Sequence, residues 1–370
     1  MVIYYYVLLF STLLAALSFS KLKLLDEDKQ YCLRLAFLSL SFLTFWLIAG
    51  LRYKIGAPDW FEYEKIFNQV SDGIFNIRFE IGYLYLNYVL SYISNDSQIV
   101  FLSVSLFVTI AYYYFCYRTL GSPYFLIAVL IYISTLYFNL NMYNVRQHIA
   151  ISIFYFSIIF ISNGRYIRAV LALMFAGLFH TTAFALIPLL FLLKIKFNRW
   201  IIAIIFFVGY IFLILNISLA DYIIYMLRFN DYLNGVINLS MSIDGLNSPR
   251  TGGFLGMAER LFFLFVVLKF YEELVKDSTS RMVTNLYLIY LAVYLFLSSY
   301  GFFIVRLNLY FASFFPIAYV LILKNQTRRK DVIFILFAIY SIVKFTLYIL
   351  GQVGNPDSFV PYRSYLESLL

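Results

Sequence analysis

The chain has 370 residues, of which 63% are hydrophobic and only 13% are charged, whereas roughly 25% of the residues of a soluble domain are charged. This composition excludes a soluble fold, because too few polar side chains remain to cover a globular surface. Long uncharged runs recur along the whole chain, and they lack the alternating pattern of outer-membrane barrel strands. We therefore predict membrane-spanning α-helices.

The cysteines, the histidines and the net charge exclude further classes of protein. The two cysteines, Cys32 and Cys116, lie in or beside apolar segments without the spacing of metal ligands, and the chain has only two histidines. We expect no disulfide, no metal site and no cofactor. The net charge of +9 comes from short basic clusters between apolar runs, a pattern typical of cytoplasmic loops. The charge therefore indicates topology, and we expect no nucleic acid as a partner.

In chain order, the apolar runs that can form membrane segments lie at residues 2–20, 33–50, 80–94, 98–117, 123–138, 145–161, 168–193, 200–219, 260–275, 282–299, 302–323 and 331–350. They predict an all-α polytopic integral membrane protein with about 11–12 membrane helices. No internal repeat or soluble linker is visible, so we treat residues 1–370 as a single transmembrane domain.

The basic clusters also predict which loops face outward. Clusters at residues 194–199, 269–281 and 324–330 belong in the cytoplasm by the positive-inside rule. Alternation then places two long loops on the extracytoplasmic side, at about residues 51–80 and 220–258.

The run at 168–193 allows two topologies. In one, it crosses the membrane once and places Arg165 and Arg168 outside. In the other, these arginines are cytoplasmic, the run forms a re-entrant hairpin of two short helices around His180, and one short run between residues 80 and 117 does not cross. The positive-inside rule favours the second topology only slightly.

The segment 50–63 combines charged and aromatic side chains at the end of a span. After a turn rich in Gly and Pro, Asp59 begins a predicted helix. Arg52 and Lys54 can bind an anion, and Asp59 or Glu62 can accept a proton. Tyr63 can stack on a sugar or anchor at the headgroups. The alternative is a charged interfacial turn within an aromatic belt.

A second polar segment, 139–148, carries three amides followed by Arg146. An arginine fork matches the geometry of a phosphate, and amides such as that of Asn144 can bind sugar hydroxyls. The alternative is an arginine that extends to the membrane surface beside a solvated turn.

His180 lies near the middle of an apolar run. An ionisable residue at membrane depth indicates a functional site. The alternative is a neutral histidine that is hydrogen-bonded through Thr181 or Thr182.

Further arginines flank the second predicted outer loop. Arg250, Glu259 and Arg260 lie where this loop returns to the membrane, and Arg306 lies at another outer mouth. Several cations on one side can neutralise a diphosphate, whereas Glu259 and Arg260 can also be a simple charge pair at a helix start.

Three of these segments resemble motifs of the EpsG family of bacterial polysaccharide polymerases, which are related in role to the Wzy O-antigen polymerases. The motifs are Gly-x-Arg-Tyr-x-x-Gly followed by Asp and Tyr at Gly50–Tyr63, a segment that begins Arg-Gln-x-x-Ala at Arg146–Ile151, and Phe-His-x-x-Ala at Phe179–Ala183. Their order and spacing make the match moderately specific over the N-terminal half, and the C-terminal half matches in outline. Ala57 and Pro58 depart from the small polar residue more usual before the aspartate.

The resemblance implies a metal-independent glycosyltransferase in the bacterial inner (cytoplasmic) membrane, with its active site facing the periplasm. Its substrate would be an oligosaccharide linked to undecaprenyl diphosphate. The growing glycan would pass from its lipid carrier to the non-reducing-end hydroxyl of a lipid-linked repeat unit. Membrane lipids and a chain-length regulator protein are the other implied partners.

This reaction requires cations on the diphosphate and a base on the acceptor hydroxyl. On this resemblance we predict that the base is His180 or Asp59. The predicted substrate-binding residues are Arg52, Arg146, Arg250, Arg260, Arg306, Tyr63 and Asn144.

Three other functions compete with polymerisation. A GT-C-type glycosyltransferase would use the carboxylates at 26–28, but the flanking lysines place that loop in the cytoplasm, on the wrong face. A membrane O-acyltransferase would use His180. A flippase or other transporter of lipid-linked oligosaccharide would show related repeats of spans, and none is visible.

Overall fold

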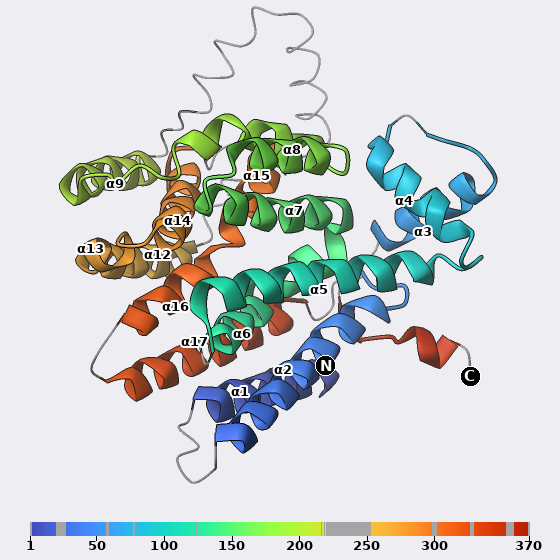
Figure 1. Ribbon diagram of the computed structural model, residues 1–370, viewed down its shortest axis with the longest axis horizontal. Coiled ribbons are helices and arrows are strands. Elements are labelled where there is room, and N and C mark those ends of the chain that lie inside the picture. The colour runs from blue at the N-terminus through green and yellow to red at the C-terminus, as the bar shows by residue number, and fades with distance from the viewer. Residues whose placement is uncertain are drawn as a thin grey trace, which may run out of the picture. The chain divides into compact units, whose positions relative to one another are not determined.

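The computed structural model consists of helices joined by turns and loops (Figure 1). Every regular element of the described residues is a helix, and the β-bridge between Arg52 and Ser364 is isolated. This confirms the all-α fold. The structure describes residues 2–19, 27–56, 59–76, 78–122, 124–215, 217, 219, 253–297, 302–325, 329–352 and 359–368.

Seven of the described helices are long and apolar enough to cross a membrane: Val2–Phe19, Lys29–Gly50, Gln98–Leu120, Val145–Ser162, Ser278–Leu297, Ile304–Asn325 and Lys330–Gln352. Shorter apolar helices lie at Phe125–Thr135, Tyr166–Gly177, Thr181–Phe191 and Arg199–Ile214. The protein is therefore a multi-pass membrane protein. Of the predicted outer loop at 220–258, residues 253–258 begin a helix, and the rest lies outside the described residues.

The chain divides into two compact units, which we describe separately. Unit 1 comprises Met1–Pro188 and Gln326–Leu370, and unit 2 comprises Leu189–Asn325. The single domain expected from the sequence stays a prediction.

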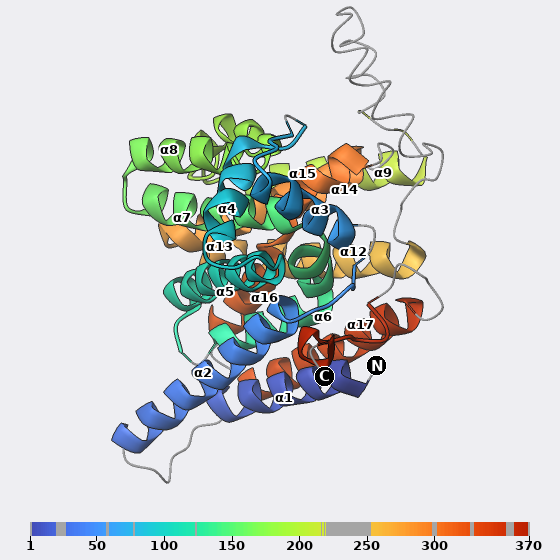
Figure 2. The same ribbon diagram turned by 90° about the vertical axis from the view of Figure 1, so that its right-hand side faces the viewer.

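Unit 1 is built around four helices, α2, α5, α7 and α8, each of which packs against the next. α5 packs against α2 and α7, and α7 packs along α8. α6 packs against α1 and α17, and Figure 2 shows α1 and α2 side by side. The elements are α1 (Val2–Phe19), α2 (Glu27–Gly50), α3 (Asp59–Ser71), α4 (Ile81–Ser91), α5 (Gln98–Leu120), α6 (Phe125–Thr135), the π-helix η1 (Phe138–Tyr143), α7 (Val145–Ser162), α8 (Tyr166–Gly177), the 3-10 helix η2 (Thr181–Leu186), α17 (Lys330–Gln352) and the 3-10 helix η4 (Tyr365–Ser368).

A close contact between α2 and α5 fixes the turn that follows α2. A Cβ added at Gly50 would lie 2.6 Å from the Ser105 hydroxyl oxygen, so only glycine allows this approach. The indole Nε1 of Trp46 donates to the carbonyl of Leu102 at 3.0 Å. The position of the segment that carries Arg52 is therefore set by helix packing.

The apolar run at 168–193 is not one continuous helix. α8 ends at Gly177, His180 is extended, and η2 and a second 3-10 helix, η3 (Pro188–Phe191), follow. The 12 residues of α8 rise about 18 Å, well short of the ~30 Å hydrocarbon core. The choice between the two topologies of this run stays a prediction.

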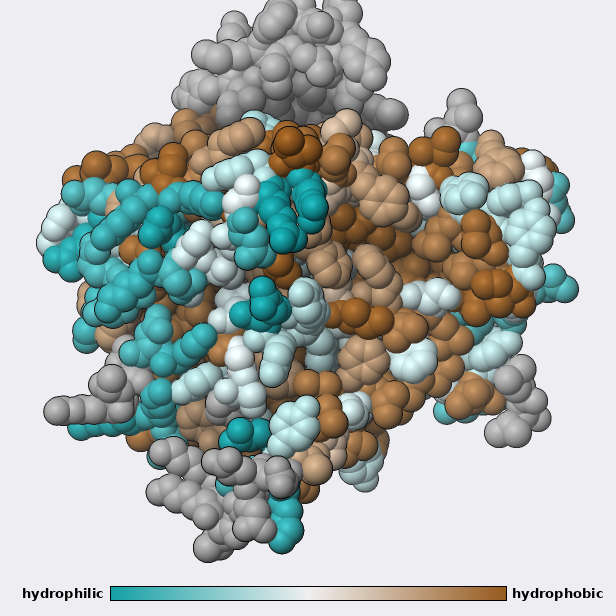
Figure 3. Space-filling view, viewed as in Figure 1, coloured by the Kyte–Doolittle hydropathy of each residue, from teal (hydrophilic) through white to brown (hydrophobic). Residues whose placement is uncertain are grey.

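Unit 2 contains α9 (Arg199–Ile214), α12 (Gly253–Lys269), α13 (Tyr271–Leu274), α14 (Ser278–Leu297), α15 (Phe302–Ala312) and α16 (Phe315–Asn325). Two basic clusters that the sequence assigns to the cytoplasm come together here. The Lys196 ammonium lies 2.7 Å from a Glu272 carboxylate oxygen, and Arg281 donates to the Lys194 carbonyl at 3.2 Å. Figure 3 shows hydrophilic side chains gathered around α9 and α13, whereas much of the remaining face is hydrophobic.

Candidate functional site

The turn after α2 is held by distant parts of unit 1. The Tyr53 amide donates to the Arg363 carbonyl at 3.0 Å, and the Tyr365 amide donates to the Leu51 carbonyl at 2.7 Å. The C-terminal segment thus pairs with this turn. Gly56 closes it with a φ of +83°, where a Cβ would lie 2.9 Å from the Met142 carbonyl oxygen.

Arg52 is buried, with only 1% of its surface exposed. Its Nη1 donates to the Ala49 carbonyl at 2.6 Å, and its guanidinium lies 4.5 Å from the centre of the Phe101 ring. Nε and Nη2 are without hydrogen-bond partners. Burial lowers the pKa of Arg52 to about 10, so the side chain stays cationic at neutral pH.

The space beside Arg52 is small. It measures about 10 Å³ and is lined in part by Asn141 and His148, which leaves room for about one water molecule. A diphosphate therefore does not fit against Arg52 in this structure. Asn141 accepts a hydrogen bond from the Tyr132 hydroxyl at 2.9 Å, and its own Nδ2 is buried without a partner.

Arg146 lies at the start of α7 and forms an ion pair with Glu80. Its guanidinium also lies 5.0 Å from the centre of the Phe79 ring. The Arg146 and Glu80 side chains are 21% and 13% exposed, so the pair is close to the surface of unit 1 but largely shielded. Sequence reasoning missed Glu80, although it was an acidic residue at the start of an apolar run.

α3 begins at Asp59, as the sequence predicts. Acidic Asp59 and Glu62 lie in its first turn, where they stabilise the positive end of the helix dipole. Trp60, Tyr63, Ile66, Phe67 and Val70 form its buried face, with the spacing of an amphipathic helix. In both views α3 and α4 lie beside the ends of α5 and α7 (Figures 1 and 2).

Tyr63 connects α3 to Arg146. Its hydroxyl donates to the Tyr143 carbonyl at 3.2 Å, and its ring centre lies 6.3 Å from that of Phe101, the ring that Arg52 contacts. Burial raises the pKa of Tyr63, Arg146 lowers it and Asp59 raises it. Tyr63 therefore lies within electrostatic reach of both side chains.

Asn144 forms part of the backbone break between η1 and α7. Its Nδ2 donates to the Asn139 carbonyl at 3.0 Å and to the Asn139 side-chain oxygen at 2.7 Å. Such π-type breaks are common at functional sites. In this conformation Asn144 shapes the turn that carries Arg146, since its amide donor is engaged within that turn.

His180 is 7% exposed, and its Nδ1 lies 2.7 Å from the Thr182 hydroxyl oxygen. Two residues earlier, the Leu178 carbonyl accepts a hydrogen bond from the Gly82 amide at 2.8 Å. Glu80, the partner of Arg146, is two residues from Gly82. The backbone turn before His180 is therefore docked on the start of α4, next to the ion pair.

Unit 2 carries the later arginines. Arg260 donates to the Tyr290 hydroxyl at 3.1 Å, and its guanidinium lies 3.9 Å from the centre of the Tyr294 ring. Arg306 lies in α15, which packs against α14. Arg250 lies outside the described residues. That these arginines share a site with Arg146 stays a prediction.

The structure thus brings Arg52, Asp59, Tyr63 and Arg146 together in unit 1, with the backbone of the His180 segment beside them. Within the described ranges, no three His, Cys, Asp or Glu side chains are grouped so that they could hold a metal ion. The carboxylate side chains of residues 26–28 lie outside the part of the chain that the structure describes.

Comparison with families of known proteins identifies a match. The sequence model of the EpsG family matches residues 35–364, which is most of the chain and includes every predicted site residue. Comparisons with curated proteins and with solved structures give no match. The chain belongs to the EpsG family, a family of Wzy-like polysaccharide polymerases.

Proposed function

We propose that this protein polymerises polysaccharide in the bacterial inner membrane, with its active site on the periplasmic side. The donor is a growing glycan on undecaprenyl diphosphate, and the acceptor is the non-reducing-end hydroxyl of a second lipid-linked repeat unit. Family membership supports polymerisation. The observation that carries the donor chemistry is the shielded Arg146–Glu80 pair beside a helix break, with Tyr63 and Asp59 around it.

The reaction breaks the bond between the anomeric carbon and the diphosphate oxygen, and the acceptor oxygen bonds to the same carbon. The electron pair leaves with the lipid diphosphate, and the acceptor proton passes to a base. We assign Arg146 to the diphosphate, because a guanidinium offers paired donors to phosphate oxygens and stabilises the charge that develops on the leaving group. His180 or Asp59 is the base.

Glu80 has a different role in this proposal. It neutralises Arg146 while no diphosphate is bound, since a shielded cation without a partner is costly. When the anionic substrate binds, it replaces or shares this contact. Glu80 is therefore a positioning residue that holds Arg146 in the direction of the donor.

Arg52 is buried deeper in unit 1 than Arg146 is. Its contact with Phe101, and the contact of Phe101 with Tyr63, place aromatic rings between Arg52 and Arg146. We assign Arg52 an electrostatic role, in which its buried positive charge favours an anion at the site without touching it. Arg250, Arg260 and Arg306 stay predicted substrate-binding residues.

A reconstitution experiment tests the proposal. The purified protein in lipid nanodiscs is mixed with lipid-diphosphate repeat units, without nucleotide and with a chelator, and the products are separated on a gel. A ladder of polymer is expected, and Arg146→Ala should abolish it. Arg165→Ala is the matched control, because Arg165 is exposed before α8. No ladder from the wild-type protein would refute the polymerase assignment.

A cellular experiment separates polymerisation from transport and acyl transfer. In an Arg146→Ala strain, single repeat units should still reach the outer face. Repeat units retained on the inner face would instead support a flippase, and a loss of acetyl groups with normal chain length would support an O-acyltransferase.

A further inference from the structure

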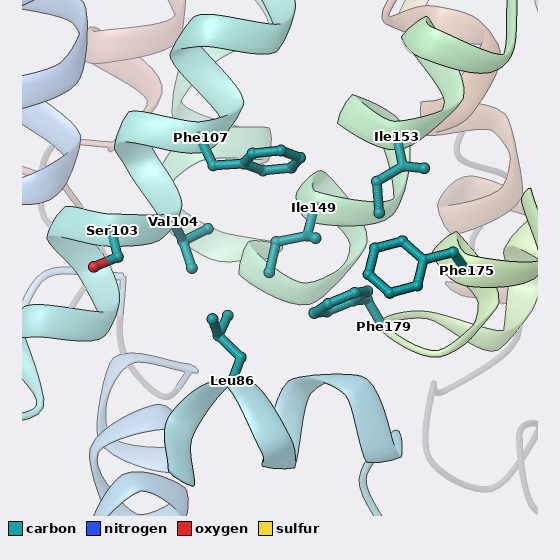
Figure 4. Close-up of a pocket in the computed structure, with 8 residues that line it drawn as sticks. All are labelled: Leu86, Ser103, Val104, Phe107, Ile149, Ile153, Phe175 and Phe179. Atoms are coloured by element: carbon teal, nitrogen blue, oxygen red, sulfur yellow. The ribbon is translucent and has the colours of Figure 1, made fainter. Parts of the chain in front are cut away.

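Unit 1 contains an apolar cavity of about 240 Å³ between α4, α5, α7 and α8 (Figure 4). Side chains from all four helices point into one space, and the Ser103 hydroxyl is directed away from its centre. The lining residues are Leu86, Ser103, Val104, Phe107, Ile149, Ile153, Phe175 and Phe179. We call this space the α4–α8 groove.

The groove starts beside the polar site. Ile149 and Ile153 follow Arg146 by three and seven residues, so all three share one face of α7. They lie about 4.5 and 10 Å further along the helix axis. Phe179 directly precedes His180 in the chain, and Leu86 lies on the helix whose first turn follows Glu80. An amphipathic molecule with its anionic end at Arg146 would therefore place its apolar end in the groove.

The size of the groove bounds what enters it. An apolar cavity of about 150 Å³ admits benzene. On this scale, 240 Å³ holds about ten carbon atoms, the content of two isoprene units. Phe107 and Phe175 are 37% and 53% exposed, so the groove opens to the outside of unit 1. A longer chain can leave it there and continue into the bilayer.

We propose that the α4–α8 groove binds the first isoprene units of a polyprenyl diphosphate, an inference that rests on the proposed function. The lining combines broad rings with branched Val and Ile side chains. Methyl-branched isoprene units fill such an irregular space, whereas a straight acyl chain leaves part of its lining without contacts. The groove therefore selects the carrier lipid and aligns its diphosphate with Arg146.

Binding of radiolabelled undecaprenyl diphosphate to the purified protein in nanodiscs tests the groove. Leu86→Trp and Ile153→Trp fill it and should weaken binding at least tenfold. Val89→Trp on α4 and Leu171→Trp on α8 are matched controls, because both side chains are exposed and neither lines the groove; they should bind as the wild type does. Wild-type affinity in both filled variants would overturn the proposal.

Two measurements on the wild-type protein avoid dependence on folding of the variants. A polyprenyl diphosphate with a diazirine on its second isoprene unit should label peptides that contain Ile149, Ile153 or Phe179, and labelling confined to other peptides would overturn the proposal. Dioleoyl phosphatidate should compete at least tenfold less well than undecaprenyl phosphate. Equal competition would show a general lipid site and overturn the selection of isoprene.

Failure of the groove and failure of the polymerase assignment give different results. If the wild-type protein forms a polymer ladder and the filled variants bind the carrier normally, only the groove proposal is rejected. If the wild-type protein forms no ladder but is labelled at Ile149 and binds the carrier through the groove, only the polymerase assignment is rejected.

Discussion

The ion pair between Arg146 and Glu80 allows the effect of Arg146 on folding to be separated from its effect on the donor. The two side chains are 21% and 13% exposed, so the pair is intermediate between a surface ion pair and a buried one. A surface pair contributes about 0–1 kcal/mol to stability, and disruption of a buried pair costs about 3–5 kcal/mol. We expect Arg146→Gln to lower the free energy of unfolding by about 2–3 kcal/mol, because it leaves the Glu80 carboxylate shielded and unpaired.

The double variant Arg146→Gln/Glu80→Gln removes both charges and leaves two amides that can hydrogen-bond. Its free energy of unfolding should return to within about 1 kcal/mol of the wild-type value, which gives a coupling energy within the usual range of about 0.5–3 kcal/mol. Polymerisation should not return, because neither amide can neutralise a diphosphate.

The assay combines thermal unfolding of each variant in one detergent with initial rates of ladder formation in nanodiscs. We expect kcat/KM to fall by about 10²–10³ in both the single and the double Arg146 variants. Glu80→Gln alone should destabilise the protein and lower polymerisation less than the Arg146 variants do, since Arg146 remains but loses the carboxylate that positions it. Recovery of polymerisation in the double variant would refute the assignment of Arg146 to the diphosphate and leave it a structural role only.

Three further predictions follow from the same region. Arg146→Lys should also lose polymerisation, because an ammonium cannot supply the paired donors of a guanidinium; normal ladders from this variant would show that charge alone is sufficient. Gly56→Ala should destabilise the protein by about 1 kcal/mol more than Gly73→Ala, because both glycines have positive φ but only at Gly56 would a Cβ meet a carbonyl oxygen, at 2.9 Å; equal unfolding midpoints would contradict this. The fall in the pKa of Arg52 to about 10 corresponds to a burial cost of about 3 kcal/mol, so Arg52→Met should raise the unfolding midpoint while polymerisation falls. Above pH 10, the unfolded state of the wild-type protein binds more protons at Arg52 than the folded state does, so Arg52 should make stability rise with pH there; a pH slope unchanged by Arg52→Met would refute this.

Hydropathy alone determined the class of the protein and the positions of most helices. A run of apolar residues must hide its backbone polar groups inside a membrane, and helices do so with local hydrogen bonds. The helix start at Asp59 was equally local, because it follows a Gly- and Pro-containing turn and places acids in the first helical turn. The resemblance to the EpsG family was also readable from the order and spacing of three motifs, and the family match confirms the family.

Only the tertiary structure revealed Glu80 as the partner of Arg146 and the pairing of residues near 363–365 with the turn at Arg52. It also showed that the 168–193 run breaks at His180 and that Arg52 is enclosed. These features depend on contacts between residues tens to hundreds of positions apart. Hydropathy and turn patterns report local backbone preferences, whereas the partner of a charge and the shape of a cavity depend on which helices pack together.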